Sequence, residues 1–197
     1  MKRIIKILTF CIFTIVAFSC AESDLIINQV YDEVDNSGAF IRTLVPPFDG
    51  PHNLAGGTFP NTIDGTIEIQ EGDGSMSPNF KEVRVYMSPF DDQDQEVPTT
   101  DLNGNSIGET FLDTLTPDQF ELSEVNGLPS TSFSIPLQQV VDILEDAVFN
   151  VPTFIYIRLE LELNDGRIFS VGSANSDVQN GNFYASPFYY NIIFLNF

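Results

Sequence analysis

This sequence has no tryptophan, a single histidine and only two cysteines. Cys11 lies inside the N-terminal apolar run, so Cys20 is the one cysteine downstream of that run, and the sequence offers neither a disulfide framework nor a thiolate metal site. The lone histidine, His52, stands in a proline- and glycine-rich stretch without a nucleophile motif, which argues against Ser–His or Cys–His catalysis. The absence of tryptophan also removes the aromatic side chain with the largest surface for stacking on sugars.

Basic residues are also few in this sequence. The chain has 8 Lys and Arg against 28 Asp and Glu, and three of the eight precede residue 7. After residue 19 the balance is five basic against 28 acidic residues, a formal charge of −23 with histidine neutral. This balance excludes nucleic acid as a partner, because phosphates are neutralised by Lys and Arg. It also argues against electrostatic docking on anionic lipid head groups.

The N-terminus predicts an export signal with a lipid anchor. A basic start is followed by the apolar run Ile7–Phe18, which is too short for a membrane span of about 20 residues. The run ends in Val16–Cys20, where a small residue directly before the cysteine resembles a bacterial lipobox. The pattern departs from the lipobox at Ala17, where leucine is usual. We predict a lipoprotein signal peptide over residues 1–19 and lipidation of Cys20, with an ordinary signal peptide as the alternative.

The residues after Cys20 indicate where in the cell the protein is located. Residues 20–24 read as a short tether, and their acidic character resembles the surface-export signal of Bacteroidota lipoproteins. We therefore expect an outer-membrane protein, lipid-anchored and facing the cell exterior. Residues 25–197 have the length of one domain with its own core.

The clearest structural signal is the stretch Thr153–Val171. Aliphatic side chains occupy alternate positions from Ile155 to Leu163, and polar or charged side chains fill the positions between them. This period of two predicts a strand with one apolar and one wet face. Asn164–Gly166 then provides residues suited to a tight turn, and Arg167–Val171 is predicted to return as the partner strand.

Other segments predict further strands and one helix. Pro136 precedes a helical spacing of apolar residues that extends from Leu137 to Val148, which predicts an amphipathic helix of about three turns. We predict a mainly β fold, an antiparallel, immunoglobulin-like β-sandwich with this single helix. The remaining strands are expected at Leu25–Tyr31, Ala39–Val45, Thr66–Gln70, Glu82–Ser88, Thr110–Leu115, Ser130–Ile135 and Phe188–Phe197.

One acidic loop is a candidate metal site, although the sequence indicates no other cofactor. Oxygen-bearing side chains occupy the first, third, fifth and ninth positions of a calcium-type loop: Asp101, Asn103, Asn105 and Glu109. The loop departs from the EF-hand, since Ser106 replaces the turn glycine and Leu112 stands where the bidentate glutamate belongs. The alternative is an exposed acidic loop with turn-forming Asn and Gly.

Four segments together carry a resemblance to a known group. After the lipobox come Asp35–Thr43, Asn126–Pro129, Leu163–Phe169 and Ser186–Phe188. In this order they are similar to uncharacterised Bacteroidota surface lipoproteins encoded near SusC/SusD-type outer-membrane transporters. The resemblance implies a sandwich fold and a non-enzymatic accessory of the outer membrane. Those relatives continue into a further domain, whereas we expect a single domain over residues 25–197 of this chain.

Three functions are consistent with these features. The first is an accessory subunit of an outer-membrane barrel complex, either a SusC/SusD-like uptake system or another barrel assembly. The second is a glycan- or peptide-binding module that uses the Pro46–Asn61 loop and the C-terminal aromatic residues. The third is a hydrolase, which would need two carboxylates facing each other across a cleft. We expect the first, and no enzymatic activity.

Overall fold

The computed structural model describes residues 38–47, 52–53, 62–72, 79–148, 152–174 and 188–195. The chain divides into two compact units, Met1–Asn36 and Ser37–Phe197, and all of the described residues belong to the second. The lipobox with Cys20, the tether and the expected strand Leu25–Tyr31 lie outside the described residues, as does most of the Pro46–Asn61 loop.

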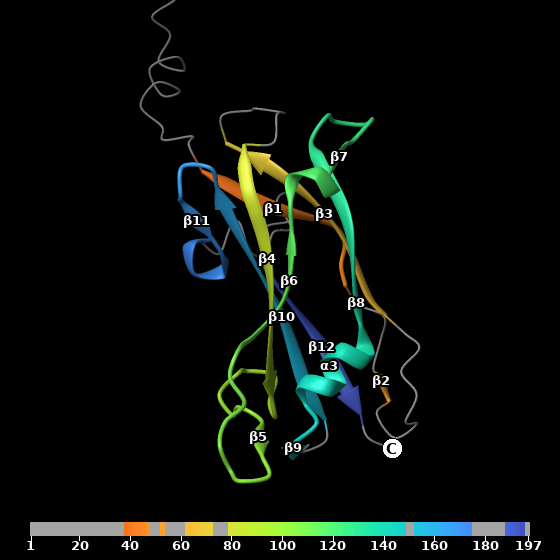
Figure 1. Ribbon diagram of the computed structural model, residues 1–197, viewed down its shortest axis with the longest axis vertical. Coiled ribbons are helices and arrows are strands. Elements are labelled where there is room, and N and C mark those ends of the chain that lie inside the picture. The colour runs from red at the N-terminus through yellow and green to blue at the C-terminus, as the bar shows by residue number, and fades with distance from the viewer. Residues whose placement is uncertain are drawn as a thin grey trace, which may run out of the picture. The chain divides into compact units, whose positions relative to one another are not determined.

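Two antiparallel sheets make up most of the second unit (Figure 1). The first sheet has the order β1-β3-β8-β7 and is formed by β1 (Ala39–Val45), β3 (Thr62–Glu71), β8 (Pro129–Pro136) and β7 (Glu121–Leu122). The second has the order β2-β12-β10-β4-β6, with β11 also paired to β10. Its strands are β2 (His52–Asn53), β12 (Tyr189–Leu195), β10 (Thr153–Leu163), β4 (Phe80–Phe90), β6 (Thr110–Leu115) and β11 (Ile168–Phe169). Among the described pairings, only β2 with β12 is parallel.

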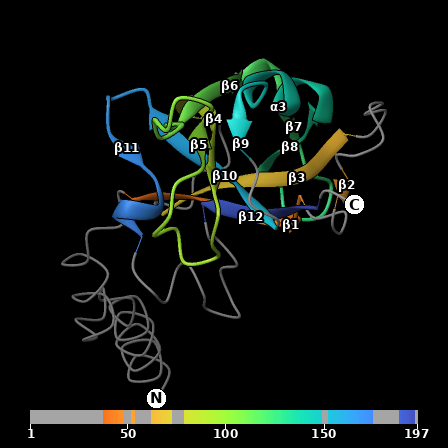
Figure 2. The same ribbon diagram turned by 90° about the horizontal axis from the view of Figure 1, so that it is seen from below.

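Smaller elements complete the unit. A two-stranded ribbon joins β5 (Thr100–Asp101) to β9 (Ala147–Val148), and two short 3-10 turns, η2 (Pro117–Gln119) and η3 (Val171–Ser173), follow β6 and β11. Helix α3 (Leu137–Ile143) lies beside β6 and β8, on the side away from β1 and β12 (Figure 2). The Gln139 side-chain amide donates to the backbone carbonyl of Leu112, which ties the helix to strand β6.

The apolar faces of the two sheets form one core. From the first sheet come Ile41, Ile63, Ile67, Ile69, Phe133 and Ile135, and from the second Val83, Val85, Met87, Ile155, Ile157, Leu159, Leu161, Leu163, Tyr190, Ile192 and Phe194. Full burial of one such aliphatic side chain contributes about 1.5–3 kcal/mol. The prediction of a mainly β, antiparallel sandwich is therefore confirmed.

Strand β10 is the central strand of the second sheet, and it has the one buried and one wet face that its alternation predicts. The side chains of Ile155 and Ile157 are fully buried, and those of Glu160 and Glu162 lie on the opposite face. Gly166 closes the turn with φ of 87°, a conformation that glycine adopts at little cost. The return strand is shorter than expected, because only Ile168 and Phe169 pair with β10 before η3 begins.

The helix is also shorter than its sequence pattern predicts. Pro136 ends β8 and caps the helix, Leu137 and Val140 are buried, and α3 ends at Ile143. Val148, which the spacing assigned to the buried helical face, instead pairs with Thr100 in the β5–β9 ribbon and is exposed. Pairing with a strand distant in sequence thus replaces the last helical turn.

Candidate functional site

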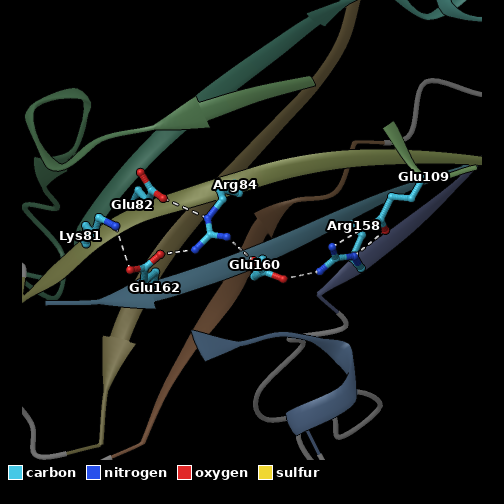
Figure 3. Close-up of polar contacts among 7 residues, drawn as sticks. All are labelled: Lys81, Glu82, Arg84, Glu109, Arg158, Glu160 and Glu162. Carbon is cyan, nitrogen blue, oxygen red and sulfur yellow. Dashed lines mark hydrogen bonds and ion pairs between the residues drawn. The ribbon is translucent and has the colours of Figure 1, made fainter. Parts of the chain in front are cut away.

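The most prominent polar feature is a ladder of charged side chains on the outer face of β4 and β10 (Figure 3). We call it the ionic ladder; its members are Lys81, Glu82, Arg84, Glu109, Arg158, Glu160 and Glu162. The strand period places Arg158, Glu160 and Glu162 on one face of β10, and the register sets Glu160 opposite Arg84. Cross-strand neighbours of opposite charge therefore meet along the two strands.

The ladder is continuous, because each arginine binds more than one carboxylate. Arg84 Nη1 lies 2.9 Å from Glu160 Oε1 and its Nε lies 3.0 Å from Glu82 Oε1; its Nη2 also contacts Glu162. Arg158 Nη1 lies 2.9 Å from the other oxygen of Glu160. Glu160 thus bridges the two guanidinium groups.

Glu109 and Arg158 form a two-point pair within the ladder. Arg158 Nε and Nη2 donate to the two carboxylate oxygens of Glu109, each at 2.7 Å. This two-point geometry orients both planar groups. The hydrogen bonds to Glu109 raise the pKa of Arg158, so its guanidinium stays charged. The pair connects β10 to the segment just before β6.

The ladder holds the carboxylate of Glu162 in the ionised form. Hydrogen bonding and charge from Lys81 lower the pKa of Glu162 below its ordinary value. A general acid for glycoside hydrolysis needs the opposite shift, a carboxyl group whose pKa is raised. The arrangement thus suits a structural network on the sheet surface better than an acid–base pair.

Aromatic side chains continue this face beyond the ladder. The guanidinium of Arg158 lies 4.3 Å from the ring centroid of Tyr86, which packs edge-on against Phe111 at 5.8 Å. Tyr156 donates its hydroxyl hydrogen to the Gln93 carbonyl at 2.5 Å. Burial raises the pKa of Tyr156. The loop after β4 is therefore fastened to this face of the sheet.

Among the described C-terminal aromatic residues, Phe188 and Tyr190 lie differently from what a sugar-stacking role requires. Phe188 and Tyr190 are buried, and Tyr190 contributes to the core between the sheets. Tyr189 points to the other face, where its ring lies 6.0 Å from that of Tyr156. Stacking on a sugar needs an accessible ring face, so Phe188 and Tyr190 are poorly placed for it.

The predicted calcium loop brings three of its four residues together. Asp101 Oδ1 accepts the backbone N–H of Asn103 and of Asn105, both at 2.8 Å, and Asp101 Oδ2 accepts the Asn105 side-chain amide at 3.0 Å. These hydrogen bonds, that from the Asn105 side chain first, lower the pKa of Asp101. The carboxylate thus organises the turn at Gly104, where φ is 83°.

Glu109, the fourth predicted ligand, is bound to Arg158 in the ionic ladder rather than to the loop. In the part of the chain that the structure describes, no group of three or more His, Cys, Asp or Glu is arranged to hold a metal ion. The calcium site stays a prediction, and it would require Glu109 to leave Arg158.

The neighbouring acidic residues are organised in the same way as Asp101. The carboxylate of Asp92 accepts the backbone N–H of Val97 at 2.8 Å and that of Glu96 at 3.1 Å, and these bonds, that from Val97 first, lower its pKa. The local sequence could have indicated this, since Asp side chains commonly accept backbone N–H groups in turns. No local sequence pattern could have indicated the Glu109–Arg158 pair, because the two residues are 49 positions apart in the chain.

Two comparisons bear on identity. No protein-family model matches this sequence, and no curated protein matches it either. No helix in the described part of the chain has the length and apolar character needed to cross a membrane.

Proposed function

We propose that this chain is a non-enzymatic outer-membrane lipoprotein, anchored through Cys20 and facing the cell exterior, which acts as an accessory subunit of an outer-membrane barrel complex. The complex would be a SusC/SusD-like uptake system or another barrel assembly. The N-terminal lipobox pattern and the acidic tether support the location. The resemblance to Bacteroidota surface lipoproteins supports the accessory role.

One structural observation favours partner binding over catalysis. The charged side chains of the ionic ladder are paired with one another within the chain, whereas large apolar side chains are exposed in several strands and loops. These exposed residues are Leu44, Val45, Val97, Leu102, Phe111, Leu122, Val125, Val148 and Ile168. Exposed apolar side chains are typical of surfaces that contact other proteins where several of them gather into one patch, whereas single exposed apolar residues are common on any protein.

Co-purification of the full-length protein from outer membranes, followed by mass spectrometry, tests this role. We expect a barrel protein in stoichiometric amount after extraction in mild detergent. Recovery of the protein from the membrane without any barrel partner would contradict the proposal.

The lipid anchor has its own test with a matched control. Metabolic labelling with an alkyne fatty acid should label the protein, and Cys20→Ser should abolish the label because it removes the sulfur that carries the lipid. Cys11→Ser changes the other cysteine and should leave labelling intact. Protease treatment of intact cells should then cleave the domain, as expected for a protein on the outer surface.

A second candidate, glycan binding, has one observation in its favour. A groove of about 250 Å³ beside β7 and β8 is lined by Gln119, Glu121, Ser130, Thr131 and Ser132. Hydroxyl and amide groups of this kind hydrogen-bond to sugars, although no aromatic ring lines the groove. Binding on a glycan array that is lost with Ser132→Ala and Gln119→Ala would support this function.

A further inference from the structure

The loop between β7 and β8 is fastened to a buried carboxylate on the outer face of the first sheet. Glu68 lies between Ile67 and Ile69, which belong to the core, so the strand period turns the Glu68 side chain outward. Glu68 is nevertheless 1% exposed. Asn126 of the loop donates a side-chain N–H to Glu68 Oε2 at 3.0 Å, and Arg42 Nη1 lies 2.8 Å from Glu68 Oε1. Asn126 therefore connects the loop to β3.

Asn126 belongs to one of three Asn–Gly pairs in this sequence, at positions 103–104, 126–127 and 180–181, the last of which lies outside the described residues. An asparagine before a glycine is prone to spontaneous deamidation, because glycine has no side chain to hinder attack by its backbone nitrogen. In this reaction the Gly127 nitrogen bonds to Asn126 Cγ, the Cγ–Nδ2 bond breaks, and ammonia leaves with the Gly127 proton. Water then opens the cyclic imide to aspartate or isoaspartate, without any oxidant or reductant.

The hairpin of β7 and β8, at the upper right of Figure 1, binds both reacting groups. The Gly127 N–H, whose nitrogen is the nucleophile, donates to the Ser123 carbonyl at 2.8 Å. The Asn126 carboxamide is held on both sides, since Nδ2 binds Glu68 and Oδ1 accepts the Leu128 N–H at 3.1 Å. Attack requires the carboxamide to turn its carbon toward the Gly127 nitrogen, so these bonds must break first. The reaction therefore proceeds from a locally opened hairpin.

We propose that Asn126 is a deamidation site that the fold suppresses, and that deamidation releases the loop from Glu68 irreversibly. The product has a carboxylate where Asn126 has an N–H donor, so the hydrogen bond to Glu68 is lost. Two like charges would also face each other at a buried position, which is unfavourable. The released loop therefore does not return to its place on β3. This inference goes beyond the proposed accessory role and does not depend on it.

Peptide mapping by mass spectrometry measures the reaction. The full-length protein is incubated in warm, mildly alkaline buffer, and conversion of Asn126 to aspartate or isoaspartate is followed with and without unfolding concentrations of urea. We expect conversion to be at least about tenfold slower in the folded protein, because opening must break a hydrogen bond to a charged group. Equal rates in the two conditions would contradict the protection.

Variants of Glu68 identify the protecting contact, with Asn103 as an internal control. Asn103 also precedes a glycine, and the Gly104 N–H donates to the Asp101 carbonyl at 2.9 Å in a loop remote from β3 in sequence. Glu68→Ala should accelerate conversion of Asn126 about tenfold and leave conversion of Asn103 unchanged. Glu68→Gln should accelerate conversion of Asn126 less, because its amide carbonyl still accepts a hydrogen bond.

The pattern of rates decides between the outcomes, with circular dichroism showing which variants are folded. If Glu68→Ala unfolds the protein, both asparagines accelerate together and Glu68→Gln decides: acceleration at Asn126 alone supports the proposal, and none overturns it. In a folded Glu68→Ala protein, an unchanged rate at Asn126 or an equal acceleration at Asn103 would also overturn it.

Hydrogen exchange measures the consequence for the loop. The Ser123 N–H donates to the Leu128 carbonyl at 2.9 Å, so this amide and that of Gly127 report whether the loop is formed. Asn126→Asp places the carboxylate of the product at this position, and exchange at both amides should accelerate. Asn103→Asp adds the same charge elsewhere and should leave both amides unchanged. Unchanged exchange in Asn126→Asp would show that deamidation does not release the loop.

Discussion

The hydroxyl oxygens of Thr43 and Tyr190 lie 2.8 Å apart and join β1 of the first sheet to β12 of the second. Both side chains point into the space between the sheets, and Tyr190 is buried there. Since 147 positions separate the two residues, this bond links the first and last described strands of the long sheets. It is a polar contact within a largely apolar core, and either hydroxyl can donate.

The stability of the fold should fall at alkaline pH because of Tyr190. Burial raises the pKa of Tyr190 to about 12, from 10.0 for an unperturbed tyrosine. The folded state therefore keeps a proton that the unfolded state loses, so stability is full below about pH 10 and declines up to about pH 12, by about 2 kcal/mol. Urea unfolding at several pH values in this range measures the decline.

Tyr190→Phe isolates this contribution. We expect the variant to lose about 1 kcal/mol at neutral pH, where the hydrogen bond to Thr43 is missing. Between pH 10 and 12 its stability should decline less than that of the wild type, because it has no phenol at this position. Parallel curves for the two proteins would show that Tyr190 does not titrate as described.

Gly65 should not tolerate even a methyl group. It stands opposite Phe133 in the β3–β8 pairing, and a Cβ at Gly65 would lie 2.6 Å from Phe133 Cζ. Gly65→Ala should therefore destabilise the fold by about 1–3 kcal/mol, measured by urea unfolding. Gly108→Ala is the matched control, since a Cβ there meets nothing within 4 Å.

A second substitution distinguishes a steric clash from a backbone effect. Adding Phe133→Leu to Gly65→Ala should cost less than the sum of the two single changes, because the shorter side chain makes room for the methyl group. Strict additivity of the three unfolding free energies would argue against the clash.

The Glu109–Arg158 pair should be coupled measurably. The two side chains are 39% and 22% exposed, and they meet through two hydrogen bonds. A double-mutant cycle with Arg158→Met and Glu109→Gln should give a coupling of about 0.5–1 kcal/mol at low salt, decreasing as salt screens the charges. The Lys81–Glu162 pair, with Lys81 54% exposed and a single contact, should give a smaller value. Equal coupling in both cycles would contradict the ranking.

The Asp101 carboxylate should control the local order of its loop. Asp101→Ala removes the acceptor for the N–H groups of Asn103 and Asn105, so hydrogen exchange at these amides should accelerate. Acidification should also accelerate exchange at these amides. Because the pKa of Asp101 in the folded protein lies below its ordinary value, the carboxylate stabilises the loop at pH above the ordinary pKa, and this stabilisation is lost as the pH falls through the folded-state pKa. Asp94→Ala, in the preceding loop, should leave the two amides unchanged.

Calcium titration tests the predicted ligand set directly. We expect no heat at millimolar calcium, because Asp101 already accepts three N–H groups and Glu109 is held by Arg158. Arg158→Met would release Glu109, and calcium binding that appears only in this variant would show that the four residues can form a site. Binding by the wild type that is lost with Glu109→Gln would contradict our expectation.

The sequence by itself determined most of the longer strands, because a period of two is a local property, but it did not indicate the two-residue strands β2, β5, β7 and β9. The alternation in β10 separates Ile157 from Glu160 whatever strand lies beside it, and β1 and β6 begin and end at the predicted residues. The excess of acidic residues, and its concentration between Arg84 and Arg158, could also be read directly from the chain.

Only the tertiary structure decided which residues meet across the sheets. Val148 was predicted to lie on the helix, but it pairs with Thr100 of β5 instead. Glu109 was predicted to bind calcium with Asp101, but it forms an ion pair with Arg158 of β10. A local pattern specifies the face on which a side chain lies but not its neighbour on another strand. That neighbour is fixed by register and packing over tens of residues, which is why the ionic ladder emerged only in the folded chain.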